Sequence, residues 1–476
     1  MPKDSLRESL FCYSDDMGRV RQVLTERERL VLLVSILASF VAFLDGSIVN
    51  VALPAIMRAF GGGLATQQWV IDAYAITLGA FMLVAGSFSD LFGRKRILRI
   101  GLLGFGVASL LCALAPSGVV LVLARALQGL AGALLVPSSL ALIISVFSGL
   151  AQGKAIGKWT AWTGIAFVVG PLLGGFLVDI SSWRWIFAVN VLPIALTLWL
   201  LSMLEVEDHP RGETKVDFVG AAACAVGLGG PVFALIEQER YGWRSPLIDI
   251  PLVVGLIVFW FFVQYERRAR HPMLPLSLFK IRNFSVGNIA TAAIYGGLSV
   301  ASFVITVFVQ QVAGYSALRA GMATLPVTFL LFFLSPRFGA LGAKFGPRWF
   351  MAGGPAVAGG GFLLMLGVSS AAPYWSQLFP GILLFGLGLS MTVAPLTAAV
   401  LGSIDSERAG IGSAVNNAVS RVAGLTAVAA VGILTGPTLR TAGFHRVLIA
   451  IAILLLVGAV VSAVGIQNPP PKSSAE

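Results

Sequence analysis

The chain of 476 residues is dominated by apolar segments that are each long enough to cross a membrane. A transmembrane helix needs about 20 mainly apolar residues, because the hydrocarbon core is about 30 Å thick. Hydrophobic residues make up 57% of this chain and charged residues only 12%, about half of the charged share of a soluble domain. A backbone in lipid must satisfy its own hydrogen bonds, so each segment is expected to be a helix. The pattern predicts an all-α polytopic membrane protein with 14 transmembrane helices.

The predicted segments share a long apolar run between short polar loops, and they comprise residues 30–53, 69–89, 97–115, 119–146, 155–178, 185–204, 217–236, 247–265, 284–312, 321–341, 349–368, 377–401, 412–434 and 444–466.

The basic residues predict the orientation of these segments. Of the 33 Lys and Arg residues, 24 fall on the side of the N-terminus, seven fall on the other side, and Arg125 and Arg421 lie within spans. Basic loops stay in the cytoplasm, so both termini are expected to be cytoplasmic in a cell membrane. The net charge of +11 is therefore explained by membrane loops, and no nucleic-acid role is expected.

An internal repeat predicts two similar halves. The stretch Gly86 to Arg96 follows the second segment, and a similar stretch from Gly339 to Arg348 follows the tenth. Eight segments separate the two stretches, as expected for two six-helix bundles with two inserted helices. The predicted divisions are a tail at 1–28, an N-terminal bundle at 29–204, an inserted pair at 205–270, a C-terminal bundle at 271–466 and a tail at 467–476.

One charged layer stands out in the first bundle. Asp45 lies inside the first apolar segment, where a carboxylate costs about 2.5–3.5 kcal/mol on insertion scales. Counted at 1.5 Å per helical residue, Asp72 and Arg125 fall in the same half of the membrane. Two interpretations are open. The carboxylates bind and release a proton as their distance from Arg125 changes, or a permanent salt bridge locks the helices together.

Other polar and small residues mark further candidate sites. Asn50, Gln128, Asn416, Asn417 and Arg421 are polar groups within spans and could line a cavity. The fifth segment holds small residues and a proline, which favour close helix packing and a kink, at Gly164, Gly170, Pro171, Gly174 and Gly175.

Nucleotide hydrolysis and metal catalysis find no support in the sequence. The stretch from Gly149 to Lys154 has the wrong spacing for a phosphate-binding loop, and no large soluble segment is present. Three scattered cysteines and three histidines show no metal-ligand spacing. We expect no metal and no cofactor, with an ion gradient as the source of energy.

Several motifs together resemble the major facilitator superfamily, and in particular its fourteen-span drug:proton antiporters. The resemblance rests on Leu44 to Pro54, Gly86 to Arg96, Arg125 to Ala133, Gly164 to Gly175, Trp183 to Asn190 and Ala394 to Asn417. One departure is Ala166, where the fifth-span motif usually has Gly. In the second loop stretch Ala343 replaces Asp90, which weakens a symmetric role for that loop.

The resemblance implies roles for two motifs. Gly86, Asp90, Gly93 and Arg94 would form a latch between the bundles, whereas a plain basic turn is the alternative. The glycines of the fifth span would seal the bundle interface against proton leak, whereas ordinary helix packing requires the same residues.

The sequence therefore favours a proton-coupled exporter of amphiphilic or cationic small molecules that works by alternating access. Its expected partners are the small-molecule substrate, protons and the lipid bilayer, with no protein partner indicated. One alternative is an exporter dedicated to a single endogenous metabolite. A transporter-like membrane sensor or a membrane enzyme is less favoured, and the short loops argue against an enzyme.

Overall fold

The structure is a computed structural model that describes residues 24–204, 217–269, 272, 274–405, 409–436 and 438–468. Within these ranges thirteen helical stretches are long and apolar enough to cross a membrane. The predicted second segment corresponds to a further long helix, α3 (Gly63–Phe92), several of whose side chains lie outside the described set. The described chain is all-helical, which confirms the predicted fold class.

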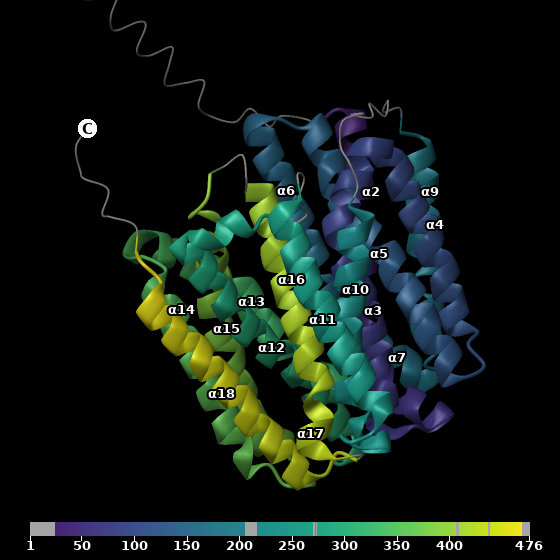
Figure 1. Cartoon of the computed structure of the whole chain (residues 1–476), viewed down its shortest axis with the longest axis vertical. Coiled ribbons are helices and arrows are strands. Elements are labelled where there is room, and N and C mark those ends of the chain that lie inside the picture. The colour runs from purple at the N-terminus through teal and green to yellow at the C-terminus, as the bar shows by residue number, and fades with distance from the viewer. Residues whose placement is uncertain are drawn as a thin grey trace, which may run out of the picture.

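The N-terminal bundle fills the purple to blue part of Figure 1. Its remaining helices are α2 (Glu26–Phe60), α4 (Arg94–Ala113), α5 (Gly118–Val146), α6 (Gly149–Gly164), α7 (Ala166–Ile180), α8 (Trp185–Ala188) and α9 (Val191–Ser202).

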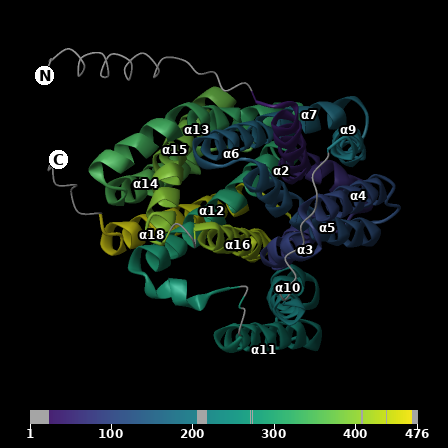
Figure 2. The ribbon, with the colours of Figure 1, turned by 90° about the horizontal axis from the view of Figure 1, so that it is seen from above.

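Two inserted helices follow, α10 (Phe218–Tyr241) and α11 (Pro246–Arg268), and they pack on each other. Figure 2 shows the pair beside α3, outside both bundles. In the most apolar 18-residue stretch of α11 only 17% is buried inside the protein. Most of this helix is therefore open to lipid.

The C-terminal bundle fills the green to yellow part of Figure 1. Its helices are α12 (Arg282–Gln311), α13 (Ala317–Phe345), α14 (Arg348–Leu364), α15 (Phe379–Leu401), α16 (Ala409–Ala429), α17 (Val431–Thr435) and α18 (Thr441–Gly465), with the short turns η1 (Leu276–Lys280), η2 (Met365–Gly367) and η3 (Tyr374–Leu378).

Helix boundaries differ from the predicted segments in two ways. The first helix begins at Glu26, where Thr25 and Glu28 form a capping box, and it continues past the apolar run to Gly61, whose φ is 73°. Three predicted spans are each interrupted in the structure, at Ile165, at Val189–Asn190 and at Ala430. Hydrophobicity marks the membrane crossing, whereas caps and local breaks decide where each helix begins and ends.

The internal repeat is visible in two equivalent turns. Gly93 joins α3 to α4 with φ of 93°, and Gly346 joins α13 to α14 with φ of 86°. Both values lie in the region that side chains other than glycine avoid, so the repeated glycines serve the same tight reversal. Each turn thus occupies the same place in its own bundle.

The two bundles are joined at the end where α2 finishes and α13 begins, which is the lower end in Figure 1. We call this the closed end. Three helix pairs meet there, α2 with α12, α3 with α16 and α7 with α13. One hydrophobic cluster runs across this end and includes Ile56 of α2 and Phe308 of α12. The bundles therefore share an apolar core at the closed end.

Candidate functional site

A buried ion pair lies at the centre of the N-terminal bundle. Asp45 of α2 is fully buried, and Arg125 of α5 is 1% exposed. Arg125 Nη1 donates to Asp45 Oδ2 at 2.5 Å. Each charge needs the other inside the membrane, because a single buried charge would lose its hydration without compensation. The structure thus brings together two of the three residues in the predicted charged layer.

Two amides complete the surroundings of the carboxylate. Gln128 Nε2 and Asn190 Nδ2 each donate to Asp45 Oδ1 at 2.9 Å. Gln128 also donates to Ser109 Oγ at 2.8 Å and accepts from Arg125 Nη1 at 2.6 Å. Both oxygens of Asp45 are therefore hydrogen-bonded to groups from two other parts of the bundle, α5 and the segment between α8 and α9, an arrangement that compensates a charged carboxylate.

The guanidinium is held from a second side by α3. Arg125 Nε donates to the carbonyl of Val70 at 2.9 Å, and its Cζ lies 4.2 Å from the centre of the Tyr74 ring. A cation over an aromatic face is attracted by the electron-rich ring. Arg125 therefore links α2, α5 and α3, and we call Asp45, Arg125, Gln128, Asn190 and Ser109 the Asp45 cluster.

Local helix geometry explains how these side chains meet. Arg125 and Gln128 are three residues apart on α5, so they share one face of that helix. Asn190 lies at the interruption between α8 and α9.

Asp72 does not join this cluster. It lies on α3, it is fully buried, and both of its carboxylate oxygens lack a hydrogen-bond partner. A buried carboxylate without any donor is far less costly when it is protonated, since the neutral acid loses much less hydration. Asp72 therefore differs in kind from Asp45, although the sequence placed both in one layer.

Arg421 lies where α16 meets α3, opposite the first bundle. The Cβ of Arg421 lies 4.0 Å from the position that a Cβ at Gly79 would take, and the Nε of Arg421 has no hydrogen-bond partner. Nearer the closed end the same helix pair is joined by Gln68, whose Nε2 donates to the carbonyls of Val428 at 2.7 Å and Ala429 at 3.1 Å. The α3–α16 contact thus combines a firm polar link with a guanidinium nitrogen that is unpartnered.

The glycines of the fifth span have unequal surroundings. A Cβ at Gly170 would lie 2.0 Å from Ser47 Oγ, and one at Gly174 would lie 2.6 Å from Ile48, so both pack against α2. A Cβ at Gly175 would lie 2.5 Å from the Cα of Leu318, across the bundle interface. At Gly164 nothing lies within 4 Å.

The last turn of α7 and the first turn of α13 form a second interbundle contact. Asp179 Oδ1 accepts from the backbone N–H of Ala317, and Oδ2 accepts from that of Leu318, both at 2.9 Å. The carboxylate thereby satisfies free donors at the start of α13, where the helix dipole also favours negative charge. Pro171 contributes as well, because its carbonyl oxygen lies 2.4 Å from where a Cβ at Gly321 would be.

The other predicted cavity residues fall in two groups. Asn416 of α16 donates to Asn288 Oδ1 at 3.1 Å and to Thr291 Oγ1 at 2.8 Å, so it ties α16 to α12. Asn417 is exposed and bonds only the backbone of its own helix. Asn50 is half-buried and likewise bonds a carbonyl of its own helix, that of Gly46.

The predicted latch is only partly described. Gly93 provides the positive-φ turn, and Arg94 is the first residue of α4. The surroundings of Gly86 and the side chain of Asp90 lie outside the described residues. Among the described residues no group of three or more potential metal ligands occurs.

Three residues at the site were not assigned to it from the sequence. Ser109, Asn190 and Tyr74 contact the ion pair or its amides, yet Ser and Tyr are common in ordinary spans. Of the three, only Asn190 could have been singled out from the sequence, as an amide within an apolar segment. Its contact with Asp45 depends on the break between α8 and α9, which hydrophobicity does not reveal.

Comparison with known proteins places this arrangement in a family. The family model described as Major Facilitator Superfamily matches residues 35–428. The puromycin resistance protein pur8 of Streptomyces alboniger is 34% identical over 86% of this chain and 82% of its own length. The multidrug resistance protein Stp of Mycobacterium tuberculosis is 34% identical over 85% of this chain and 75% of its own. The methylenomycin A resistance protein of Bacillus subtilis is 31% identical over 85% and 87%.

Solved structures share the fold at low sequence identity. A D-xylose-proton symporter is 15% identical, with 92% of this chain and 98% of that chain covered and a TM-score of 0.66. The peptide transporter POT in complex with sulfate is 16% identical, with 93% and 95% covered and a TM-score of 0.67. With the matches to the drug and antibiotic resistance proteins, these findings show that the chain is a multi-pass membrane protein belonging to the Major Facilitator Superfamily.

Proposed function

We propose that the protein exports amphiphilic or cationic small molecules in exchange for protons, and that it is not an enzyme. The observation that carries the proposal is the buried Asp45–Arg125 ion pair, at 2.5 Å, within a transporter fold. The names of the relatives support the substrate class, since they include resistance proteins for puromycin and methylenomycin A and a multidrug resistance protein.

The ion pair is connected to the interface between the bundles through backbone. Arg125 binds the carbonyl of Val70, two residues from Gln68, which bonds α16 across the interface. On α2, the carbonyl of Val51 accepts from Gln310 of α12 at 3.0 Å, less than two turns from Asp45. A proton on Asp45 would remove the charge that holds Arg125, and both helices at the interface would feel the change.

The orientation of the basic loops supports a direction for this cycle. With both termini in the cytoplasm of a plasma membrane, the closed end faces outward and the structure corresponds to the inward-facing state. The Asp45 cluster is then ionised when the substrate arrives from the cytoplasm. In the outward-facing state Asp45 takes up a proton, Arg125 moves away and the substrate leaves.

Proton release on substrate binding tests this proposal directly. Wild type and variants are purified in weakly buffered detergent and mixed with a panel of cationic drugs, and the protons released are measured. The same proteins are assayed for uphill transport in everted vesicles. Asp45→Asn should abolish both substrate-induced proton release and uphill export, while binding of a cationic drug falls by about tenfold or less. Asp405→Asn, which changes an exposed carboxylate, should leave both unchanged.

Two outcomes would contradict parts of the proposal. Uphill export at the wild-type rate in Asp45→Asn would show that Asp45 does not couple transport to protons. Export of a single compound from a broad panel would favour the dedicated metabolite exporter and would contradict the broad substrate class.

A further inference from the structure

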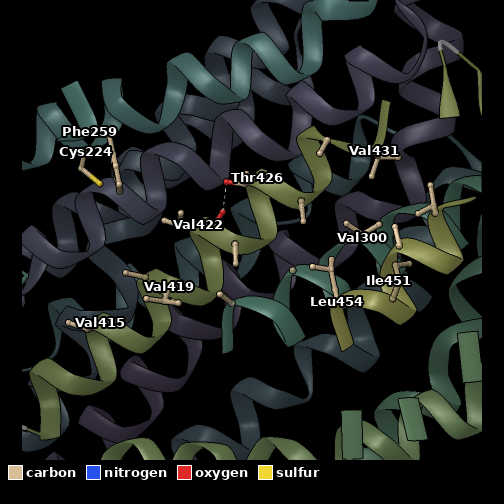
Figure 3. A pocket seen from close by; sticks show the side chains of 18 of the residues that line it. Cys224, Phe259, Val300, Val415, Val419, Val422, Thr426, Val431, Ile451 and Leu454 are labelled. Carbon is tan, nitrogen blue, oxygen red and sulfur yellow. Dashed lines mark hydrogen bonds between the residues drawn. The ribbon is translucent and has the colours of Figure 1, made fainter. Parts of the chain in front are cut away.

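A lateral groove separates the inserted helix pair from the C-terminal bundle. It encloses about 620 Å³, within the range of about 300–1,000 Å³ that is usual for small-molecule sites. Side chains of α10, α11, α12, α16, α17 and α18 line it. Figure 3 shows Val415, Val419, Val422 and Thr426 following one another along α16, with Cys224 and Phe259 on one side. We call this space the lateral groove.

The lining offers almost no polar group to a ligand. Beside the apolar side chains it contains the Cys224 thiol and the hydroxyl of Thr426, which already donates to the carbonyl of Val422 at 2.8 Å. A buried water needs two to four polar partners, and a cationic drug needs at least one anchor. Neither finds them here, so the groove suits a hydrocarbon chain.

The length of the groove fits the bilayer. Its lining runs along α16 and α17 from Val415 to Leu434, which corresponds to about 28 Å of helix at 1.5 Å per residue. The hydrocarbon core of a membrane is about 30 Å thick. An occupant that fills this groove therefore runs parallel to the lipid chains around it.

The two ends of the groove differ in charge. Near one end, the exposed Lys280 directly follows the lining residue Phe279, and the exposed Arg267 and Arg268 end the helix that carries Phe262. The buried Glu266 beside them accepts from the backbone N–H of Leu274. At the other end Glu239 approaches α17, because a Cβ at Gly432 would lie 3.8 Å from its Cδ. A negatively charged headgroup is therefore attracted to the first end, whereas at the second end Glu239 offsets the exposed Arg446.

From these features we propose that the lateral groove binds one anionic phospholipid. One acyl chain lies along α16 between the inserted pair and α18, and the phosphate lies beside Arg267 and Lys280. The lipid fills a space that the inserted helices leave beside the C-terminal bundle. The site does not depend on the transported substrate or on proton coupling.

Lipid retained through purification tests the proposal. The protein is purified in a mild detergent containing equal amounts of phosphatidylglycerol and phosphatidylcholine, and bound lipid is counted by native mass spectrometry. Wild type should retain one phosphatidylglycerol per chain, with about tenfold preference over phosphatidylcholine. Thr426→Trp should fill the groove and lower this occupancy about tenfold. Val460→Trp, at a lipid-facing position of α18 that is 61% exposed, should not.

The headgroup is tested by charge. The double variant Arg267→Gln/Lys280→Gln should keep a bound lipid but reduce the preference for phosphatidylglycerol to about twofold or less. Arg446→Gln removes an exposed charge at the opposite end and should keep the preference.

Three results would overturn the assignment. They are equal retention of the two lipids by wild type, unchanged occupancy in Thr426→Trp, and a co-purified drug-like compound in place of lipid. If Thr426→Trp does not fold, Ala430→Phe fills the groove from a second position in its lining and is judged by the same measurement.

Discussion

Asp45 and Asp72 are both fully buried in the N-terminal bundle, yet their surroundings are opposite. Asp45 accepts hydrogen bonds from Arg125, Gln128 and Asn190, whereas neither oxygen of Asp72 has a partner. The first environment stabilises a charged carboxylate and the second a neutral acid. The comparison teaches that depth in the membrane does not decide how a carboxylate is compensated. The donors around it do.

The difference also suggests a division of roles. Asp45 is placed to switch, because a proton would change its bond to Arg125. For Asp72 we propose that a proton is kept while the closed end stays shut, since the residue lies on α3 one turn from Gln68, which joins the bundles. The predictions below run from the largest expected effect to the smallest.

Removing the guanidinium should have the largest effect. Arg125→Met leaves Asp45 charged without its cationic partner, so we expect a loss of about 3–5 kcal/mol in stability and no transport. Thermal unfolding in detergent measures the loss. The double variant Arg125→Met/Asp45→Asn should recover at least half of it, because no charge is then stranded. Additive effects of the two substitutions would show that the ion pair contributes nothing to folding.

One methyl group added at Gly175 should prevent the two bundles from meeting at the closed end. Gly175→Ala places a Cβ 2.5 Å from the Cα of Leu318, and backbone cannot move aside as a flexible side chain can. We expect transport to fall about a hundredfold, with the closed end now open to a membrane-impermeant thiol reagent at Ala317→Cys. Gly164→Ala, where nothing lies within 4 Å, is the matched control and should stay within twofold of wild type. Equal transport by the two alanine variants would contradict a tight interface at Gly175.

The glycine pair shows how far the sequence could predict this site. Small residues in the fifth span indicated close packing, yet the spacing could not show that Gly174 faces α2 while Gly175 faces the other bundle. Asp45, Arg125 and Gln128 were identifiable because charges and amides are costly in an apolar run. The contact of Asn190 with Asp45 and the isolation of Asp72 were not predictable, because they depend on a helix break and on helix rotation. The fold was predicted more fully, since fourteen apolar runs and a repeated turn determine most of it.

The two carboxylates should differ in their effect on stability. If Asp72 is the neutral acid that we propose, Asp72→Asn replaces it with a neutral group of the same shape, so we expect the free energy of unfolding to change by about 0.5 kcal/mol or less. Asp45→Asn should cost about 1–3 kcal/mol, because Arg125 loses its counter-charge. Side-by-side thermal unfolding of both variants checks this order. A larger loss in Asp72→Asn than in Asp45→Asn would reverse the proposed protonation states.

A smaller effect than that of Asp45→Asn is expected at the cap on α13. Asp179→Asn keeps one acceptor for the N–H groups of Ala317 and Leu318 but removes the negative charge at the start of the helix. Such a charge is worth about 0.3–1 kcal/mol, so the closed state should lose two- to fivefold in population. Thiol labelling of Ala317→Cys, with and without Asp179→Asn, measures that shift.

Asp249→Asn is the control for this prediction. It alters a similar carboxylate in the first turn of α11, away from the bundle interface, and should leave the labelling rate unchanged. Because Asp179 acts only when the bundles touch, its removal should speed opening at the closed end without altering the Asp45 cluster. A change in substrate-induced proton release in Asp179→Asn would therefore show that the gate and the ion pair are more tightly linked than the geometry implies.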